Sequence, residues 1–240
     1  MTAHYHDLAK SSEAVSSRNF VFADGHLRSA THQPESDESD IYRDGVKRLL
    51  DVVLVLVSLP LVLPIILVFA AIVALDGGKP FYCQNRVGKN GRTYTMWKLR
   101  SMVLCAEEKL AVHLAQDPEA KAEWDSTQKL KDDPRITRFG RFLRKSSFDE
   151  LPQLLNVLLG DMSIVGPRPM LPEQEPLYSG TAYFELRPGI TGLWQISDRN
   201  ESTFAARAKF DTDYFEQLSL ATDVRIIAST FRVVLRGTGY

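Results

Sequence analysis

The order of apolar and polar residues divides the chain into three parts. Residues 1–42 are rich in Ser, Asp, Glu and His and lack apolar periodicity, which predicts a disordered N-terminal tail. No apolar core follows a basic start there, so the tail does not resemble a signal peptide. Residues 43–78 combine a basic flank with a long apolar run, and residues 79–240 have the mixed pattern of a globular, mainly helical domain.

The apolar run, VVLVLVSLPLVLPIILVFAAIVAL at residues 52–75, is long enough to cross a bilayer, which takes about 20 apolar residues. Pro60 and Pro64 lie near its middle and predict a bend. Basic residues flank both ends, Lys47 before the run and Lys79 after it, and basic flanks favour the cytoplasmic side. These features favour a membrane-embedded re-entrant helix hairpin that enters and leaves on the cytoplasmic face. The alternative is a proline-kinked helix that spans the membrane.

The part after the apolar run begins with strand-like segments and continues with helices. Residues 81–103 predict a β-hairpin, because Asn90-Gly91 is a turn signal between two strand-like flanks. Residues 104–131 predict an exposed helical pair that Pro118 interrupts. The expected fold class is therefore α+β and mainly helical, with a short β-hairpin and amphipathic surface helices.

The distribution of charge is more informative than the net charge of −1, which argues neither for nor against a nucleic-acid partner. In RITRFGRFLRK, residues 135–145, arginines recur at every third position beside apolar residues, at Arg135, Arg138, Arg141 and Arg144. Three interpretations stay open: a phosphate-binding pocket, contact with anionic lipids, or a solvated charged face. The two cysteines, Cys83 and Cys105, have no spacing typical of a zinc site or a disulfide framework.

The segment SSFDELPQLLNVLLG, residues 146–160, places two adjacent carboxylates before an apolar helical pattern that Gly160 ends. Pro152 limits where the helix begins, and with Asp149 as the N-cap it falls where its missing donor is harmless. A helix N-terminus and nearby arginines favour an ionised Asp149. An ionised carboxylate is a candidate nucleophile or metal ligand, and a plain helix cap is the simpler interpretation.

Two later segments are rich in turn residues. In GPRP, residues 166–169, two prolines hold Arg168 on a stiff backbone, which suits an aimed guanidinium or a simple rigid turn. In RPGITGLWQ, residues 187–195, Trp194 predicts a stacking surface or a membrane-interface anchor. Residues 223–237 predict an amphipathic helix.

Together these motifs resemble the monotopic phosphoglycosyl transferases, the bacterial sugar transferase family. The matching pieces cover residues 43–240 and are, in order, KRLLDVVL, the apolar run with its proline, QNRVG, KLRSM, the segment from DPRITRF to GPRP, RPGITGLWQ and TDVRII. Several motifs in order are highly specific, whereas a lone Asp-Glu pair is not. The resemblance implies a re-entrant membrane helix followed by a small catalytic domain, residues 79–240, on the cytoplasmic face of the bacterial inner membrane.

The resemblance also implies an activity. Family members transfer a sugar phosphate from a nucleotide diphosphate sugar to a polyprenyl phosphate and release a nucleoside monophosphate. The layout of a tail and a single domain resembles the exopolysaccharide-initiating members. The expected reaction is therefore transfer of a hexose-1-phosphate from a UDP-sugar to undecaprenyl phosphate with release of UMP, the first membrane step of exopolysaccharide synthesis. Family members work through a covalent phospho-aspartyl sugar and use Mg²⁺. The expected partners are the UDP-sugar, polyprenyl phosphate and membrane lipids, without nucleic acid. A homo-oligomer or glycan-assembly partners are left open.

Carried over by position, Asp149 is the nucleophile and a Mg²⁺ ligand, and Glu150 is its partner. Arg144 and Arg168 match family arginines tied to the substrate site. Lys98 and Arg100 fall in the family's basic motif and are expected to bind substrate.

One position departs from the family pattern. Many members place a serine directly before the helix-breaking proline, where Leu63 precedes Pro64 here. Two rival functions are a membrane-anchored scaffold without catalysis and a membrane-bound phosphohydrolase.

Overall fold

The computed structural model describes residues 41–127, 130–197 and 204–235, all within one compact unit. The expected tail, residues 1–42, lies almost entirely outside the described residues. The short π-helix η1 (Tyr42–Val46) leads into α2 (Lys47–Ala74), and the hairpin β1 (Phe81–Val87) and β2 (Thr93–Leu99) follows. The remaining helices are α3 (Ala106–Gln116), α4 (Pro118–Thr127), α5 (Arg138–Lys145), α6 (Gln153–Leu159), α7 (Ala182–Glu185), α8 (Leu193–Ile196), α9 (Phe204–Glu216) and α10 (Leu220–Leu235).

Strands are few. β1 and β2 form an antiparallel pair, and β3 (Ser163–Val165) pairs in parallel with β4 (Gly189–Thr191). These small sheets among many helices confirm the mainly helical α+β class. The Asn-Gly turn is also confirmed, because Asn90 and Gly91 have φ of 58° and 72° between two seven-residue strands.

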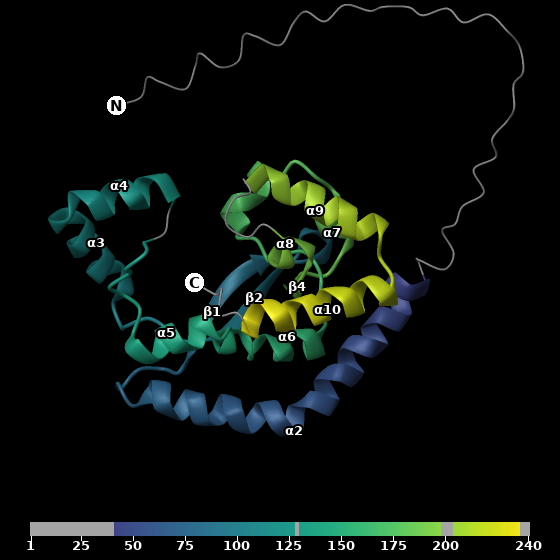
Figure 1. Cartoon of the computed structure of the whole chain (residues 1–240), viewed down its shortest axis with the longest axis horizontal. Helices are drawn as coiled ribbons and strands as arrows, with labels where there is room; N and C mark the ends of the chain where they lie inside the picture. Colours follow the sequence, from purple (N-terminus) through teal and green to yellow (C-terminus); the bar gives the residue numbers. More distant parts are fainter. Residues whose placement is uncertain (1–40, 128–129, 198–203, 236–240) are drawn as a thin grey trace, which may run out of the picture. The chain divides into compact units, whose positions relative to one another are not determined.

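Helix α2 carries the apolar run and continues through Pro60 and Pro64 as one 28-residue helix. Within the described part of the chain it is the helix long and apolar enough to cross a membrane. Its ribbon bends between its N-terminal and C-terminal halves, as the two prolines predict (Figure 1). Ser58 donates to the carbonyl of Val55, so its hydroxyl does not reach the carbonyls four residues before either proline.

The N-terminal end of α2 is tied to the rest of the protein by buried polar contacts. Lys47 Nζ lies 2.5 Å from Asp223 Oδ2 on α10. Arg48 donates to the carbonyls of Val157 and Leu158 near the end of α6. A cation at these last carbonyls suits the negative end of a helix. The start of the membrane-length helix is therefore fixed against α6, the helix that follows the carboxylate pair.

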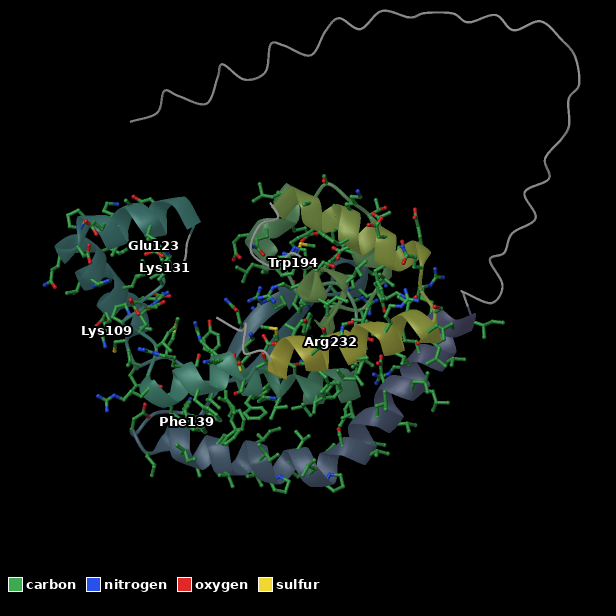
Figure 2. All side chains as sticks on the ribbon, viewed as in Figure 1. Lys109, Glu123, Lys131, Phe139, Trp194 and Arg232 are labelled. Atoms are coloured by element: carbon green, nitrogen blue, oxygen red, sulfur yellow. The ribbon has the colours of Figure 1, made fainter. Side chains whose placement is uncertain are left out.

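The helices α3 and α4 stand apart from the other elements (Figure 1). Pro118 is the first residue of α4, so the expected interruption of this helical pair is confirmed. The backbone N–H of Lys131 donates to Glu123, and both side chains lie in this part of the chain (Figure 2). The guanidinium of Arg135 lies 5.0 Å from the ring centre of Trp124, which ties α4 to the segment before α5.

Asn156 joins α6 to the hairpin. Its side chain is fully buried, accepts from the N–H of Trp97 and donates to the carbonyl of Thr95, at 3.1 and 2.7 Å. Both partners lie on β2 just before Lys98. Asn156 therefore sets how the strand that carries Lys98 lies against the helix that follows Asp149.

Asn156→Ala is expected to lower the free energy of unfolding by about 2–4 kcal/mol, because it empties a fully buried side-chain position and leaves two partly buried backbone groups without partners. Denaturation of the purified protein in detergent micelles measures this change. Asn85→Ala is the matched control, because Asn85 is exposed and accepts only a long 3.4 Å hydrogen bond from Thr95. Equal losses in the two variants would contradict a special role for Asn156.

Candidate active site

A cleft with a volume of about 580 Å³ lies between the hairpin, the segment that follows β2, α5, the 3₁₀ turn η3 (Phe148–Glu150) and α8. All the site residues expected from the sequence line it: Lys98, Arg100, Arg144, Asp149, Glu150 and Arg168. These residues are up to 70 positions apart in the sequence. The fold thus brings the predicted site together in one cavity.

Asp149 is not the N-cap of α6, and this expectation from the sequence was wrong. Helix α6 begins at Gln153, Pro152 takes the cap position, and Asp149 lies earlier, inside η3. The reason is that Pro152 has no N–H with which to continue an α-helical ladder, so the chain makes i→i+3 bonds through this segment. Ser147, with φ of 57°, turns the chain into η3 and sends Asp149 into the cleft.

Burial dominates the electrostatics of Asp149. The pKa of Asp149 is raised to about 6, mainly by burial and also by the charge of Glu150, although Lys98 and Arg144 act to lower it. The expectation that cap position and arginines favour the ionised form was therefore incomplete, since burial outweighs them. The partner carboxylate is neutralised directly, because Lys98 Nζ lies 2.7 Å from Glu150 Oε1 and 4.0 Å from Asp149 Oδ2.

If Asp149 acts as a nucleophile, the reaction rate depends on its ionisation. Below pH 6 the protonated fraction grows, so kcat/KM is expected to fall about tenfold for each pH unit and to level off above pH 7. A pH–rate profile of the purified protein measures this dependence. A flat profile between pH 5 and 7 would count against Asp149 as the ionising group.

Ser101, which lies just after β2, holds Arg144 at the wall of the cleft. The Nε of Arg144 donates to Ser101 Oγ at 2.8 Å, and burial lowers the pKa of its guanidinium while Asp149 and Asp133 act to raise it. The close approach of α5 to Ser101 depends on Gly140, where a Cβ would lie 1.9 Å from the Ser101 carbonyl oxygen. Arg144 therefore reaches Asp149 because α5 has a glycine at its contact with the chain after β2.

Arg100 lines the cleft, but its guanidinium is turned to the end of α2. It forms an ion pair with Asp76 and donates to the carbonyls of Val73 and Lys79. These contacts link the end of the membrane-length helix to β2. Substrate binding by Arg100 stays a prediction.

Arg168 lies at the part of the cleft near α8. Its guanidinium carbon lies 5.3 Å from the centre of the Trp194 ring, and Arg207 donates to its backbone carbonyl. Arg207 also lies over the Trp194 ring, at 5.7 Å. Trp194, labelled in Figure 2, thus packs against arginines, a role that neither sequence interpretation of this residue had named.

Two arginines near the cleft were not assigned from the sequence. Arg86 lines the cleft and belongs to the QNRVG motif, so a signal for it was present. Arg207 is buried against the Trp194 ring and belongs to no motif, so only the structure reveals it.

Asp149 and Glu150 are the candidate ligands for a hard cation, such as Mg²⁺, that also binds phosphate. Among the residues the structure describes, no group of three or more His, Cys, Asp or Glu side chains gathers as a metal site. Mg²⁺ is commonly held by one or two carboxylates together with substrate phosphates, and Asp149 and Glu150 provide that donor set. The residues present therefore fit a metal that arrives with its substrate.

A carboxylate pair in an arginine-lined cleft is an arrangement that suits phosphate-bearing substrates, and Arg100 in the cleft wall also contacts the end of the membrane-length helix. The chain belongs to the bacterial sugar transferase family, whose pattern matches residues 42–237. The family expected from the motifs is thereby confirmed.

Individual relatives support this membership. The chain is 46% identical over 196 residues to the UDP-galactose-lipid carrier transferase of Erwinia amylovora, and 44% identical over 196 residues to the undecaprenyl-phosphate galactose phosphotransferase of Salmonella typhimurium. Each comparison covers 81% of this chain and 41% of the relative, so the chain spans less than half the length of these proteins. It is also 44% identical over 196 residues to the exopolysaccharide production protein ExoY of Rhizobium meliloti, covering 80% of this chain and 87% of that protein.

Proposed function

We propose that this protein transfers a hexose-1-phosphate from a UDP-hexose to undecaprenyl phosphate, releases UMP, and so begins exopolysaccharide synthesis. The observation that carries the proposal is the buried Asp149 beside Glu150 in an arginine-lined cleft. The names of the Erwinia and Salmonella relatives, a UDP-galactose-lipid carrier transferase and an undecaprenyl-phosphate galactose phosphotransferase, support the choice of donor and acceptor.

The proposed reaction has two displacement steps at one phosphorus atom. A carboxylate oxygen of Asp149 attacks the phosphorus that bears the sugar, and the bond from that phosphorus to the bridging oxygen breaks. The electron pair stays on the bridging oxygen, which leaves as part of UMP. An oxygen of the acceptor phosphate then attacks the same phosphorus, the bond to Asp149 breaks, and the carboxylate is restored.

The residues around Asp149 serve these steps. Lys98 and Arg144 offset the charge of a carboxylate that approaches a diphosphate, and they hold phosphate oxygens in line for attack. Glu150, paired with Lys98, helps to orient that lysine at the reacting phosphate. Asp149 and Glu150 would hold Mg²⁺, which supplies neutralisation of phosphate charge when bound.

The acceptor reaches this site from the membrane in our proposal. We infer that α2 is re-entrant, with the catalytic domain on the cytoplasmic face of the inner membrane, because basic residues flank both ends of a helix bent at two prolines. A groove of about 310 Å³ between α2 and α6 has a wholly apolar lining and includes Leu151 and Pro152, which directly follow Glu150. A polyprenyl chain in this groove would place its phosphate near Asp149.

The experiment that tests this function measures UMP release by purified protein in nanodiscs with Mg²⁺ and a panel of UDP-hexoses, with and without undecaprenyl phosphate. The proposal predicts sustained UMP release that requires the lipid acceptor. Sustained release without acceptor would indicate a phosphohydrolase, and no release with any donor would indicate a scaffold. Either result would overturn the proposed transfer.

A further inference from the structure

Arg86 lies on the same strand face as other cleft residues. Tyr82, Gln84 and Arg86 alternate along β1 and all line the cleft, while Lys98 pairs with Tyr82 across the hairpin. The backbone of Arg86 is thus about 13 Å along the strand from the pair that carries Lys98. This places Arg86 in the same cavity as the carboxylate pair, but farther along it.

Two contacts fix the guanidinium of Arg86. One terminal nitrogen donates to Gln84 Oε1 at 2.6 Å, which directs the group back along the strand, and the other donates to the carbonyl of Pro169 at 3.3 Å. The buried Nε has no hydrogen-bond partner among the described residues. Arg86 is therefore held in place while part of its donor capacity is unused.

Arg168 is the charged neighbour of Arg86. Arg86 donates to the carbonyl of Pro169, the residue after Arg168, and both arginines line the cleft. Burial and the charge of Arg168 lower the pKa of Arg86. Neither arginine forms an ion pair with a carboxylate among the described residues. The Trp194 ring packs against the guanidinium of Arg168, and Arg207 donates to the Arg168 backbone carbonyl.

The cations near Asp149 have carboxylates beside them, which distinguishes them from Arg86 and Arg168. Lys98 is paired with Glu150, Arg135 with Asp133, and Arg144 lies near the carboxylate of Asp149. In the part of the chain that the structure describes, these two guanidinium groups of one cleft have no carboxylate ion-pair partner. This favours a bound anion, and phosphate oxygens match the fork geometry of a guanidinium.

We propose that Arg86 and Arg168 form a second anion subsite in the cleft, which binds the phosphate of the nucleoside monophosphate that leaves the donor. This inference rests on the proposed sugar-phosphate transfer. As the bridging oxygen departs with the electron pair, negative charge develops on that phosphate, and the two guanidinium groups stabilise it. Lys98 and Arg144 act on the phosphate that stays with the sugar.

The test compares UMP with uridine as ligands of the purified protein in nanodiscs. Arg86→Gln should weaken UMP binding by about tenfold or more in calorimetry, since a charge-assisted contact is lost, and should leave inhibition of UMP release by uridine unchanged. The KM for undecaprenyl phosphate should also stay unchanged. Arg92→Gln is the matched control, because it removes an exposed arginine of the same hairpin that does not line the cleft.

The outcomes separate this subsite from the function on which it rests. If the wild-type protein turns over and Arg86→Gln binds UMP as the wild type does, the subsite is overturned and the transferase proposal stands. A variant that loses UMP and uridine affinity equally overturns it too, since that result indicates only a structural role. If Arg86→Gln does not fold, Arg86→Lys is tested in its place. This variant should also bind UMP more weakly than the wild type while its inhibition by uridine stays unchanged. If the wild type releases no UMP, the transfer fails, and direct UMP binding by wild type and variant, with uridine as competitor, still decides the subsite.

Discussion

Asp149→Asn is expected to lower UMP release by at least about 1,000-fold while leaving the fold intact. An asparagine amide has nearly the same shape as the carboxylate but is a far weaker nucleophile toward phosphorus. The carboxylate of Asp149 accepts a hydrogen bond from its own backbone N–H, and the amide oxygen of an asparagine can accept the same bond. Initial rates with UDP-hexose and undecaprenyl phosphate, together with the unfolding temperature, measure both effects.

The control for this substitution is Asp125→Asn. Asp125 lies on α4, where it forms an exposed ion pair with Lys121, and it does not line the cleft. This variant should keep wild-type rates. Substantial turnover by Asp149→Asn, within about tenfold of the wild type, would rule out the nucleophile assignment, and the phosphate chemistry would need another residue.

Gly140→Ala is expected to have the second-largest effect on the reaction rate, because it displaces Arg144 without changing any residue of the cleft. A Cβ at residue 140 would lie 1.9 Å from the backbone oxygen of Ser101, so α5 must move away. Arg144 lies one turn later on α5 and would lose its 2.8 Å contact with Ser101 Oγ. We expect a loss of about 1–3 kcal/mol in stability and a fall of about 100-fold in kcat, because small displacements of a positioning group strongly affect rate.

Gly45→Ala is the control for this substitution. Gly45 lies in η1 with nothing within 4 Å of an added Cβ, and alanine stabilises helical structure relative to glycine. Gly45→Ala should leave rate unchanged and stability unchanged or slightly higher. If Gly140→Ala behaves like Gly45→Ala, the close contact between α5 and Ser101 does not position Arg144.

Local patterns predicted the elements of this fold well. The Asn90-Gly91 turn, the interruption at Pro118 and the bend near Pro60 and Pro64 each follow from backbone preferences within a few residues. Such preferences act without regard to distant packing. They could therefore be predicted from the sequence alone.

The environment of the site depends on contacts that sequence does not reveal. Asp149 was expected to be ionised at a helix cap, whereas burial in the cleft raises its pKa to about 6. Arg100 shares a motif with Lys98, but its guanidinium is held by Asp76 at the end of α2. In both cases the deciding partner or surface comes from the packing of distant elements, which no spacing in the chain records.

The predicted site set, by contrast, came from ordered motifs. Residues separated by much of the chain, from Lys98 to Arg168, were assigned to one site, and the structure places them in one cleft. Arg207 could not be assigned in this way, because it contacts Trp194 but lies in none of these motifs.

Detection of the phospho-aspartyl sugar itself would test covalent transfer through Asp149. Wild-type protein would be incubated with Mg²⁺ and the UDP-hexose that supports turnover, without lipid acceptor, then quenched, digested and analysed by mass spectrometry. Covalent transfer through Asp149 predicts release of one equivalent of UMP per protein and one hexose phosphate on the peptide that carries Asp149. Addition of undecaprenyl phosphate should remove this hexose phosphate from the protein. An adduct on another residue, or acceptor-dependent turnover with no adduct formed, would contradict covalent transfer through Asp149.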